Sequence, residues 1–140
     1  MPGQQKYRRT RHLVLAATDA VVFVADSQYT AASMNLEMLN DLEELLSDRG
    51  MCLEGRQNLA LQQIPIVFFY NKRDLAEIMP VQYMDTLFGL PSLQAPRFTG
   101  EATAGKNVVR AANAAATLAL KRLEEKIYGP EHQDARVEAE

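Results

Sequence analysis

Residues 64–70 form a continuous apolar run that ends directly in Asn71, Lys72, Arg73 and Asp74. A run that is rich in β-branched and aromatic residues and has no polar alternation is typical of a strand covered on both faces, as in a parallel α/β sheet. In such sheets, ligands bind just beyond the carboxyl ends of the strands. The stretch therefore predicts a buried strand that carries its four polar residues to a binding site.

A second apolar run, Val21–Ala25, also ends in a polar residue, Asp26, and predicts a second buried strand. The expected elements are, in chain order, a loop running into a helix near residues 13–16, a strand over 21–25, a helix ending at Gly50, the strand over 64–70, a short helix between Pro80 and Gly89, a brief strand within 96–100 and a helix over 108–127. Such alternation predicts an α/β fold, a three-layer parallel sheet with helices on both faces and right-handed crossovers.

Three local expectations accompany this pattern. Ser27, Thr30 and Ser33 offer oxygens that could cap the helix ending at Gly50. Residues 51–63 are polar and mixed, which indicates a connector with at most a short helical turn. The last helix has an apolar stripe formed by Val108, Ala112, Ala116, Ala119, Leu123 and Ile127.

The chain has 140 residues, of which 47% are hydrophobic, so it is long enough for one domain with a core. We expect residues 1–128 to form an α/β domain and residues 129–140 to form a disordered acidic tail. The net charge of -3 argues against general nucleic-acid binding, and no run is long enough to span a membrane. The single Cys52 excludes an internal disulfide and a cysteine-rich metal site, and a cytoplasmic location is the default expectation.

The spacing Asn71-Lys72-x-Asp74 directly after a buried strand suits the recognition of guanine. A carboxylate at Asp74 can accept two parallel hydrogen bonds from the N1–H and the exocyclic amine of guanine, a pattern that adenine does not present. The Asn71 amide can bond the base and tie neighbouring loops together, and the Lys72 stem can lie flat over the purine with its ammonium in water. The competing interpretation is a solvated turn after a strand, and the position of the motif at a strand end favours guanine.

With these residues the chain resembles the Ras-like small GTPases and, within them, the bacterial MglA-like group associated with gliding motility and cell polarity. The likeness runs to about Ile127 and is carried by Pro2-Gly3-Gln4 with Tyr7, by Val21 to Ser27, and above all by Ile64 to Leu75.

The resemblance assigns roles to two groups of residues near the base. Asn71, Lys72 and Asp74 would form the guanine-specificity motif of the family. Thr99 and Gly100 would lie where the family has a Ser-Ala-type loop whose backbone N–H contacts the guanine oxygen, although Thr-Gly departs from that consensus. The resemblance thus implies a guanine-binding set of Asn71, Lys72, Asp74, Thr99 and Gly100.

The resemblance also implies a switch and its chemistry. Pro2 and Gly3 would belong to the switch that senses the γ-phosphate, and Gln4 would orient the attacking water as the catalytic residue. The intact family binds GTP or GDP with Mg²⁺ and works with protein partners such as GTPase-activating or effector proteins. No nucleic-acid partner, membrane span or metal-ligating residue in this chain is expected.

One departure from the family limits these expectations. The sequence contains no G-x-x-x-x-G-K-[ST] motif, the loop that cradles phosphates and Mg²⁺, and Gly105-Lys106 is followed by Asn107. The first switch of the family and its first strands are also absent. We therefore expect residues 1–128 to be a partial GTPase-like α/β domain, the C-terminal, guanine-specificity part of a small GTP-binding protein. Its guanine affinity is expected to be weak or lost, with no GTP hydrolysis on its own.

A second class of function stays open. Without the first strand of the family, the strand over 21–25 would have a bare apolar edge, which is a template for pairing with another chain. The alternative is a nucleotide-independent interaction module that assembles through this exposed strand edge.

Overall fold

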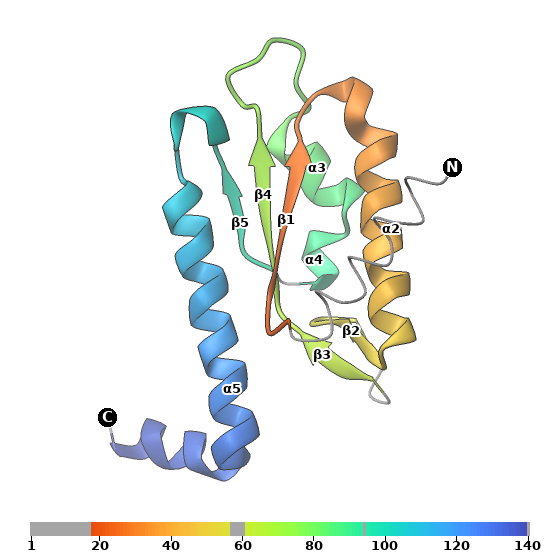
Figure 1. The fold of residues 1–140 in the computed structure, drawn as a ribbon. Helices are drawn as coiled ribbons and strands as arrows, with labels where there is room; N and C mark the ends of the chain where they lie inside the picture. The colour runs from red at the N-terminus through yellow and green to blue at the C-terminus, as the bar shows by residue number, and fades with distance from the viewer. Residues whose placement is uncertain (1–17, 57–60, 94, 140) are drawn as a thin grey trace.

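The computed structural model describes residues 18–56, 61–93 and 95–139. Its elements are, in chain order, β1 (Val21–Asp26), the 3-10 turn η1 (Tyr29–Ala31), α2 (Ala32–Asp48), β2 (Met51–Leu53), β3 (Gln62–Ile64), β4 (Ile66–Asn71), α3 (Val81–Leu87), α4 (Leu90–Leu93), β5 (Arg97–Thr99), η2 (Ala102–Ala104) and α5 (Val108–Ala139) (Figure 1). The helix expected near residues 13–16 and the residues Pro2, Gly3 and Gln4 lie outside the described residues.

The main sheet has the order β1, β4, β5, and both pairings are parallel (Figure 1). Strand β4 lies between the other two, and its residues from Ile66 to Tyr70 are all buried. The predicted buried strand is therefore the centre of the sheet. Because all three strands run in the same direction, their carboxyl ends meet at one edge, where Asn71 lies opposite Asp26.

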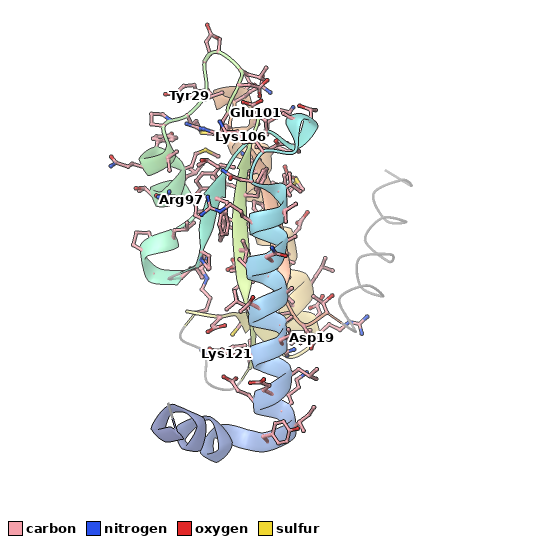
Figure 2. The ribbon with its side chains drawn as sticks, turned by 90° about the vertical axis from the view of Figure 1, so that its left-hand side faces the viewer. Asp19, Tyr29, Arg97, Glu101, Lys106 and Lys121 are labelled. Atoms are coloured by element: carbon pink, nitrogen blue, oxygen red, sulfur yellow. The ribbon has the colours of Figure 1, made fainter. Side chains whose placement is uncertain are left out.

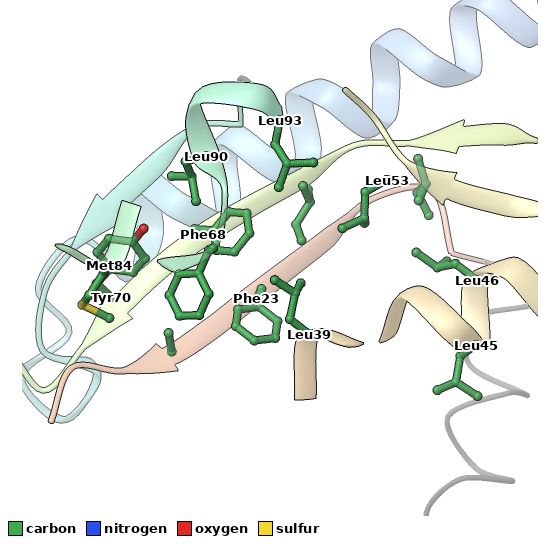
Figure 3. Close-up of a cluster of buried hydrophobic side chains, with 14 of the residues drawn as sticks. Phe23, Leu39, Leu45, Leu46, Leu53, Phe68, Tyr70, Met84, Leu90 and Leu93 are labelled. Carbon is green, nitrogen blue, oxygen red and sulfur yellow. The ribbon is translucent and has the colours of Figure 1, made fainter. Parts of the chain in front are cut away.

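Side chains of β4 alternate between two hydrophobic clusters, one on each face of the sheet. Phe68 and Tyr70 pack with Phe23 of β1 in the larger cluster, against helices α2, α3 and α4 (Figure 3). Val67 and Phe69 point to the other face, where α5 covers them. A strand that is covered in this way cannot show polar alternation. The predicted three-layer α/β fold is confirmed.

Tyr70 links β4 to helix α3 through a buried hydroxyl. The Tyr70 hydroxyl donates a hydrogen bond of 2.8 Å to Asp85, and the Arg97 guanidinium of β5 donates two more to the same carboxylate, at 2.8 and 3.1 Å. Burial, together with the bond to Asp85, raises the pKa of Tyr70 above its ordinary value. The hydrogen bond to Asp85 likewise raises the pKa of Arg97. This network fixes α3 and β5 relative to the central strand.

The connector over residues 51–63 differs from the prediction. It contains two strands, β2 and β3, which pair in parallel and place Leu53 opposite Ile64. Both of these side chains are fully buried, and Met51 is buried beside them. Strands of three residues are too short to show a period of two, so the polar Gln62 and Gln63 concealed them in the sequence.

The face that α5 turns to the sheet also differs from the prediction. Val108 and Leu123 of the predicted stripe are 39% and 43% exposed, and Ile127 is 63% exposed. The residues that face the sheet are Ala111, Ala114, Ala115 and Leu118, followed by the buried Arg122. Both stripes have helical spacing, and the small alanines allow the helix to approach Val67 and Phe69 closely. Periodicity alone therefore selected the wrong side of the helix.

The start of α2 does not use the predicted side-chain caps. The turn η1 runs directly into α2, and no side chain caps either element. Backbone bonds of the 3-10 type take this role instead, such as the one from the Ala32 N–H to the Tyr29 carbonyl oxygen. The Ser27 hydroxyl is buried and has no hydrogen-bond partner among the described residues.

Gly129 interrupts α5 with a left-handed backbone, φ 73° and ψ 173°, at the predicted end of the domain. Beyond it the backbone is helical again to Ala139 and runs in a different direction (Figure 1). Alanine and glutamate, which occur twice each over residues 130–139, favour a helix. The disorder of the acidic segment stays a prediction. No helix in the described part of the chain is long and apolar enough to cross a membrane.

The position of α5 can be tested with two leucine substitutions. Leu118→Ala is expected to lower the free energy of unfolding by about 2 kcal/mol, because it removes contacts to the cluster around Val67 and Phe69. The matched change Leu123→Ala on the exposed side is expected to cost less than about 0.5 kcal/mol. Urea unfolding of both variants measures the difference. A larger loss of unfolding free energy in Leu123→Ala than in Leu118→Ala would show that the stripe predicted from the sequence faces the sheet after all.

Candidate functional site

The candidate site lies at the edge where the parallel strands end and the loops after β1, β4 and β5 come together. Asp26 and Asn71 are register partners at the ends of β1 and β4, and Thr99 ends β5 opposite Tyr70. Figure 2 shows Tyr29, Glu101 and Lys106 at this end of the molecule, whereas Asp19 and Lys121 lie at the other end. The predicted residues Asn71, Lys72, Thr99 and Gly100 are thus brought to one edge.

Asn71 ties the three loops of this edge together. Its side-chain oxygen accepts a hydrogen bond of 2.8 Å from the backbone N–H of Ala102, in the turn after β5. Its backbone oxygen accepts another, of 3.1 Å, from the N–H of Ser27 after β1. Asn71 therefore fixes the loops on both sides of β4, as its amide was expected to do.

Lys72 crosses from the end of β4 to the end of β1. Its backbone is left-handed, with φ 64°, and its ammonium Nζ lies 3.0 Å from Oδ2 of Asp26. Gln28 also donates to the Asp26 carboxylate, from its backbone N–H at 3.0 Å and from its side-chain amide at 3.1 Å. Burial alone would raise the pKa of Asp26, but the hydrogen bonds from Gln28 and Lys72 outweigh it and lower that pKa below its ordinary value.

Gly100 has no space for a side chain. A Cβ built there would overlap the carbonyl oxygen of Lys106 and come within 3.1 Å of the Phe69 ring. The Gly100 N–H already donates to the Tyr70 oxygen at 3.0 Å, and the Gly100 oxygen accepts from the N–H of Arg73 at 3.2 Å. Gly100 therefore shapes the loop and connects it to β4, and its own N–H is not available to a ligand.

Asp74 lies one turn beyond the edge, in the loop between β4 and α3. The N–H of Leu75 donates to the Lys72 oxygen and closes the turn that carries Asp74. Arg73 fixes the same loop, since its guanidinium donates to the Met79 oxygen at 2.6 Å. The Asp74 side chain is exposed, and within residues 18–56, 61–93 and 95–139 no group forms a hydrogen bond or ion pair with its carboxylate. It is thus open to a ligand from solvent.

Two features of this edge escaped the sequence reasoning. Asp26, the partner of Lys72, had no assigned role, although it ends its apolar run just as Asn71 ends the other. The backbone N–H of Ala102, to which Asn71 binds, leaves no sequence signal, because any residue except proline offers an N–H.

The edge combines the exposed Asp74 carboxylate, the methylene stem of Lys72 and the loop after β5, which Asn71 holds in place. This set suits a flat base that presents adjacent N–H donors, which is the pattern of guanine. For a metal ion, by contrast, no group of three or more His, Cys, Asp or Glu residues in the described part of the chain offers a set of ligands. The chemistry of the described residues therefore suits a base and not a metal ion.

The close packing of Gly100 gives a direct prediction. Gly100→Ala is expected to lower the free energy of unfolding by more than about 1 kcal/mol, since the new methyl group would displace the loop from Lys106 and Phe69. The control is Gly105→Ala, where the φ of 71° adds strain but the space is open, so the cost should be the smaller of the two. Equal losses of unfolding free energy in the two variants, measured by urea unfolding, would contradict the crowding at Gly100.

The lowered pKa of Asp26 predicts how its contribution to stability depends on pH. Because the folded pKa lies below the ordinary value of 3.8, the charged carboxylate stabilises the fold above about pH 4, and this contribution is lost as the pH falls through the folded pKa. The difference in unfolding free energy between the wild type and Asp26→Asn should be constant near neutral pH and shrink in acid. A difference that does not change between pH 7 and pH 2 would contradict it.

Comparisons with known proteins give two matches. Residues 1–119 match the family described as Arf, the ADP-ribosylation factor family. The chain is also 35% identical over 123 residues to Mutual gliding-motility protein MglA from Myxococcus xanthus (strain DK1622). This alignment covers 88% of the chain and 58% of the relative, so the chain spans little more than half of the length of that protein.

Proposed function

The chain belongs to the ADP-ribosylation factor family of Ras-like small GTPases, and from this premise we propose that it is the guanine-specificity part of a small GTP-binding regulator. The observation that supports this most is the placement of Asn71, Lys72 and Asp74 at the carboxyl end of the central strand. Asn71 braces the loop after β5 there, and the Asp74 carboxylate is open to solvent.

In the proposed complex, Asp74 accepts hydrogen bonds from N1–H and the exocyclic amine of guanine. The Lys72 stem packs against one face of the base, with its ammonium held at Asp26. Thr99 and Gly100 contribute through the shape of their loop, which Asn71 and Asn107 fix, the latter by donating to the Thr99 oxygen at 2.6 Å. Recognition of the base thus depends on Asp74, and the other residues position it or limit the space around it.

The switch completes the proposal. Gln4, next to Pro2 and Gly3, would orient water for GTP hydrolysis, as in the family that the sequence resembles. These residues lie outside the described part of the chain. Regulation by a GTPase-activating or effector protein and a role in cell polarity follow from the same resemblance. A role in gliding motility follows from the resemblance and from the name of the relative.

The proposed affinity of this chain for guanine nucleotides is low. In GTPases, phosphate and Mg²⁺ contacts neutralise most of the charge of the nucleotide, and base contacts mainly supply specificity. The chain has no G-x-x-x-x-G-K-[ST] motif to cradle phosphates. We therefore propose recognition of the base without efficient hydrolysis by this chain alone.

Titration with GDP, ADP and xanthosine diphosphate tests this function. The wild type should prefer GDP over ADP, and Asp74→Asn should weaken GDP binding by roughly tenfold or more, because an amide donor then faces the donors of guanine. The same variant should gain relative affinity for xanthine, which carries an oxygen where guanine has its amine. Glu77→Gln, an equal change of charge in the same loop, serves as the control. Equal binding of GDP and ADP by the wild type would refute the proposal.

A second candidate function rests on the outer face of β1. Val22 and Val24 lie on the same face of the sheet as α5, but 39% and 51% of their surfaces stay exposed. Among the described residues β1 pairs only with β4, so its other edge has no partner strand there. This apolar edge favours an interaction module that assembles through β1. A monodisperse oligomer whose thermal stability ignores guanine nucleotides would support it, and a monomer stabilised by GDP but not by ADP would exclude it.

A further inference from the structure

The Asp26 carboxylate is held in place by contacts from two sides. Asn35 of α2, itself buried, fixes the backbone of Asp26 through two hydrogen bonds, one from its side-chain amide to the Asp26 oxygen at 2.8 Å and one from the Asp26 N–H at 3.2 Å. Gln28 donates to the carboxylate from its backbone and its side chain. The carboxylate therefore has a defined position before it meets the ammonium of Lys72.

The register of the sheet decides where this carboxylate lies. Asp26 is paired with Asn71, the residue that directly precedes Lys72. The left-handed backbone of Lys72 directs its side chain across to β1, where Nζ reaches Oδ2 of Asp26 at 3.0 Å. The methylene stem of Lys72 consequently spans the distance between the ends of two neighbouring strands. Without a partner, an exposed lysine would sample many rotamers.

We propose that Asp26 is a positioning residue for base recognition, which holds the Lys72 stem extended across the carboxyl edge as a preformed surface for the purine. This inference rests on the proposed guanine-binding function and adds a residue to it. Asp26 touches Lys72 and not the base. Its effect is to remove the rotamers of Lys72 before the ligand arrives, so that binding no longer has to order that side chain.

The ordinary interpretation of such a pair is a surface ion pair with little effect. The Lys72 side chain is 46% exposed, and ion pairs at such partly exposed positions contribute little to stability. Two observations distinguish this one: the bracing of the carboxylate by Gln28 and Asn35, and the position of the lysine inside the motif Asn71-Lys72-x-Asp74. The inference therefore predicts a change in nucleotide affinity, in addition to the small contribution of the Asp26 carboxylate to the stability of the fold.

The first experiment measures the pairing without any nucleotide. The full chain is labelled with trace acetic anhydride, and the acetylation of Lys72 is compared by mass spectrometry with that of the exposed Lys121. Asp26→Asn should raise the ratio of Lys72 acetylation to Lys121 acetylation by roughly two- to fivefold. This factor corresponds to the free energy of a partly exposed ion pair. The control Glu43→Gln breaks a similarly exposed pair with Arg56 and should leave the ratio unchanged. An unchanged ratio in Asp26→Asn would overturn the inference.

The second experiment measures what the pairing does for binding. Asp26→Asn should weaken GDP binding by roughly three- to tenfold, the expected cost of ordering one long side chain. The preference for GDP over xanthosine diphosphate should not change, since Asp74 is intact. Glu43→Gln should bind GDP like the wild type, and Asp26→Glu should restore part of the affinity.

The outcomes separate the inference from the function on which it rests. Equal GDP affinity of Asp26→Asn and the wild type overturns the role of Asp26 and leaves guanine recognition in place. A loss of guanine selectivity in Asp26→Asn would also overturn it, because Asp26 would then act on the base. A wild type that does not distinguish GDP from ADP refutes the proposed function, and the role of Asp26 with it.

Discussion

The parallel pairing of β4 between β1 and β5 is the constraint on which the rest of the structure depends. Ile66 to Tyr70 are buried, so that this strand needs a helical layer on each face and a partner on each edge. Phe68 and Tyr70 anchor one layer, and Val67 and Phe69 the other. Since all three strands point the same way, the same pairing brings the loops after β1, β4 and β5 to one edge.

Hydrophobic packing fixes the strands, but it does not fix the loops beyond them. Beyond the end of β4, hydrogen bonds hold the loops in place. Asn71 accepts a bond from the Ala102 N–H, and Arg73 donates to the backbone oxygens of Gly100 and Met79. Gly100 permits this close approach because it has no side chain. The residues that suit a guanine base are thus set in a hydrogen-bonded frame built on a hydrophobic strand.

The sequence predicted the parts of this architecture that have a strong local signature. Long apolar runs identified β1 and β4, and Gly129 marked the break in α5. The sequence did not reveal β2 and β3, because strands of three residues are too short to give a pattern. It also did not identify the buried side of α5, because this helix carries two apolar stripes. The buried stripe consists mostly of alanine, whose small side chain gives a weak periodic signal although it allows the closest packing.

The candidate site was likewise predicted only in part. Asn71, Lys72 and Asp74 are contiguous, so a motif could identify them, whereas the contact between Lys72 and Asp26 joins residues that are 46 positions apart. Only the parallel register of β1 and β4 brings these two together, and a shift by one residue would turn the Asp26 side chain to the opposite face of the sheet. The buried runs that form the core thereby also set the position of the lysine at the ligand edge. The fold and the proposed recognition of guanine are coupled through the register of the sheet, so that a change in the core of β1 that shifts this register would alter the proposed site without touching its residues.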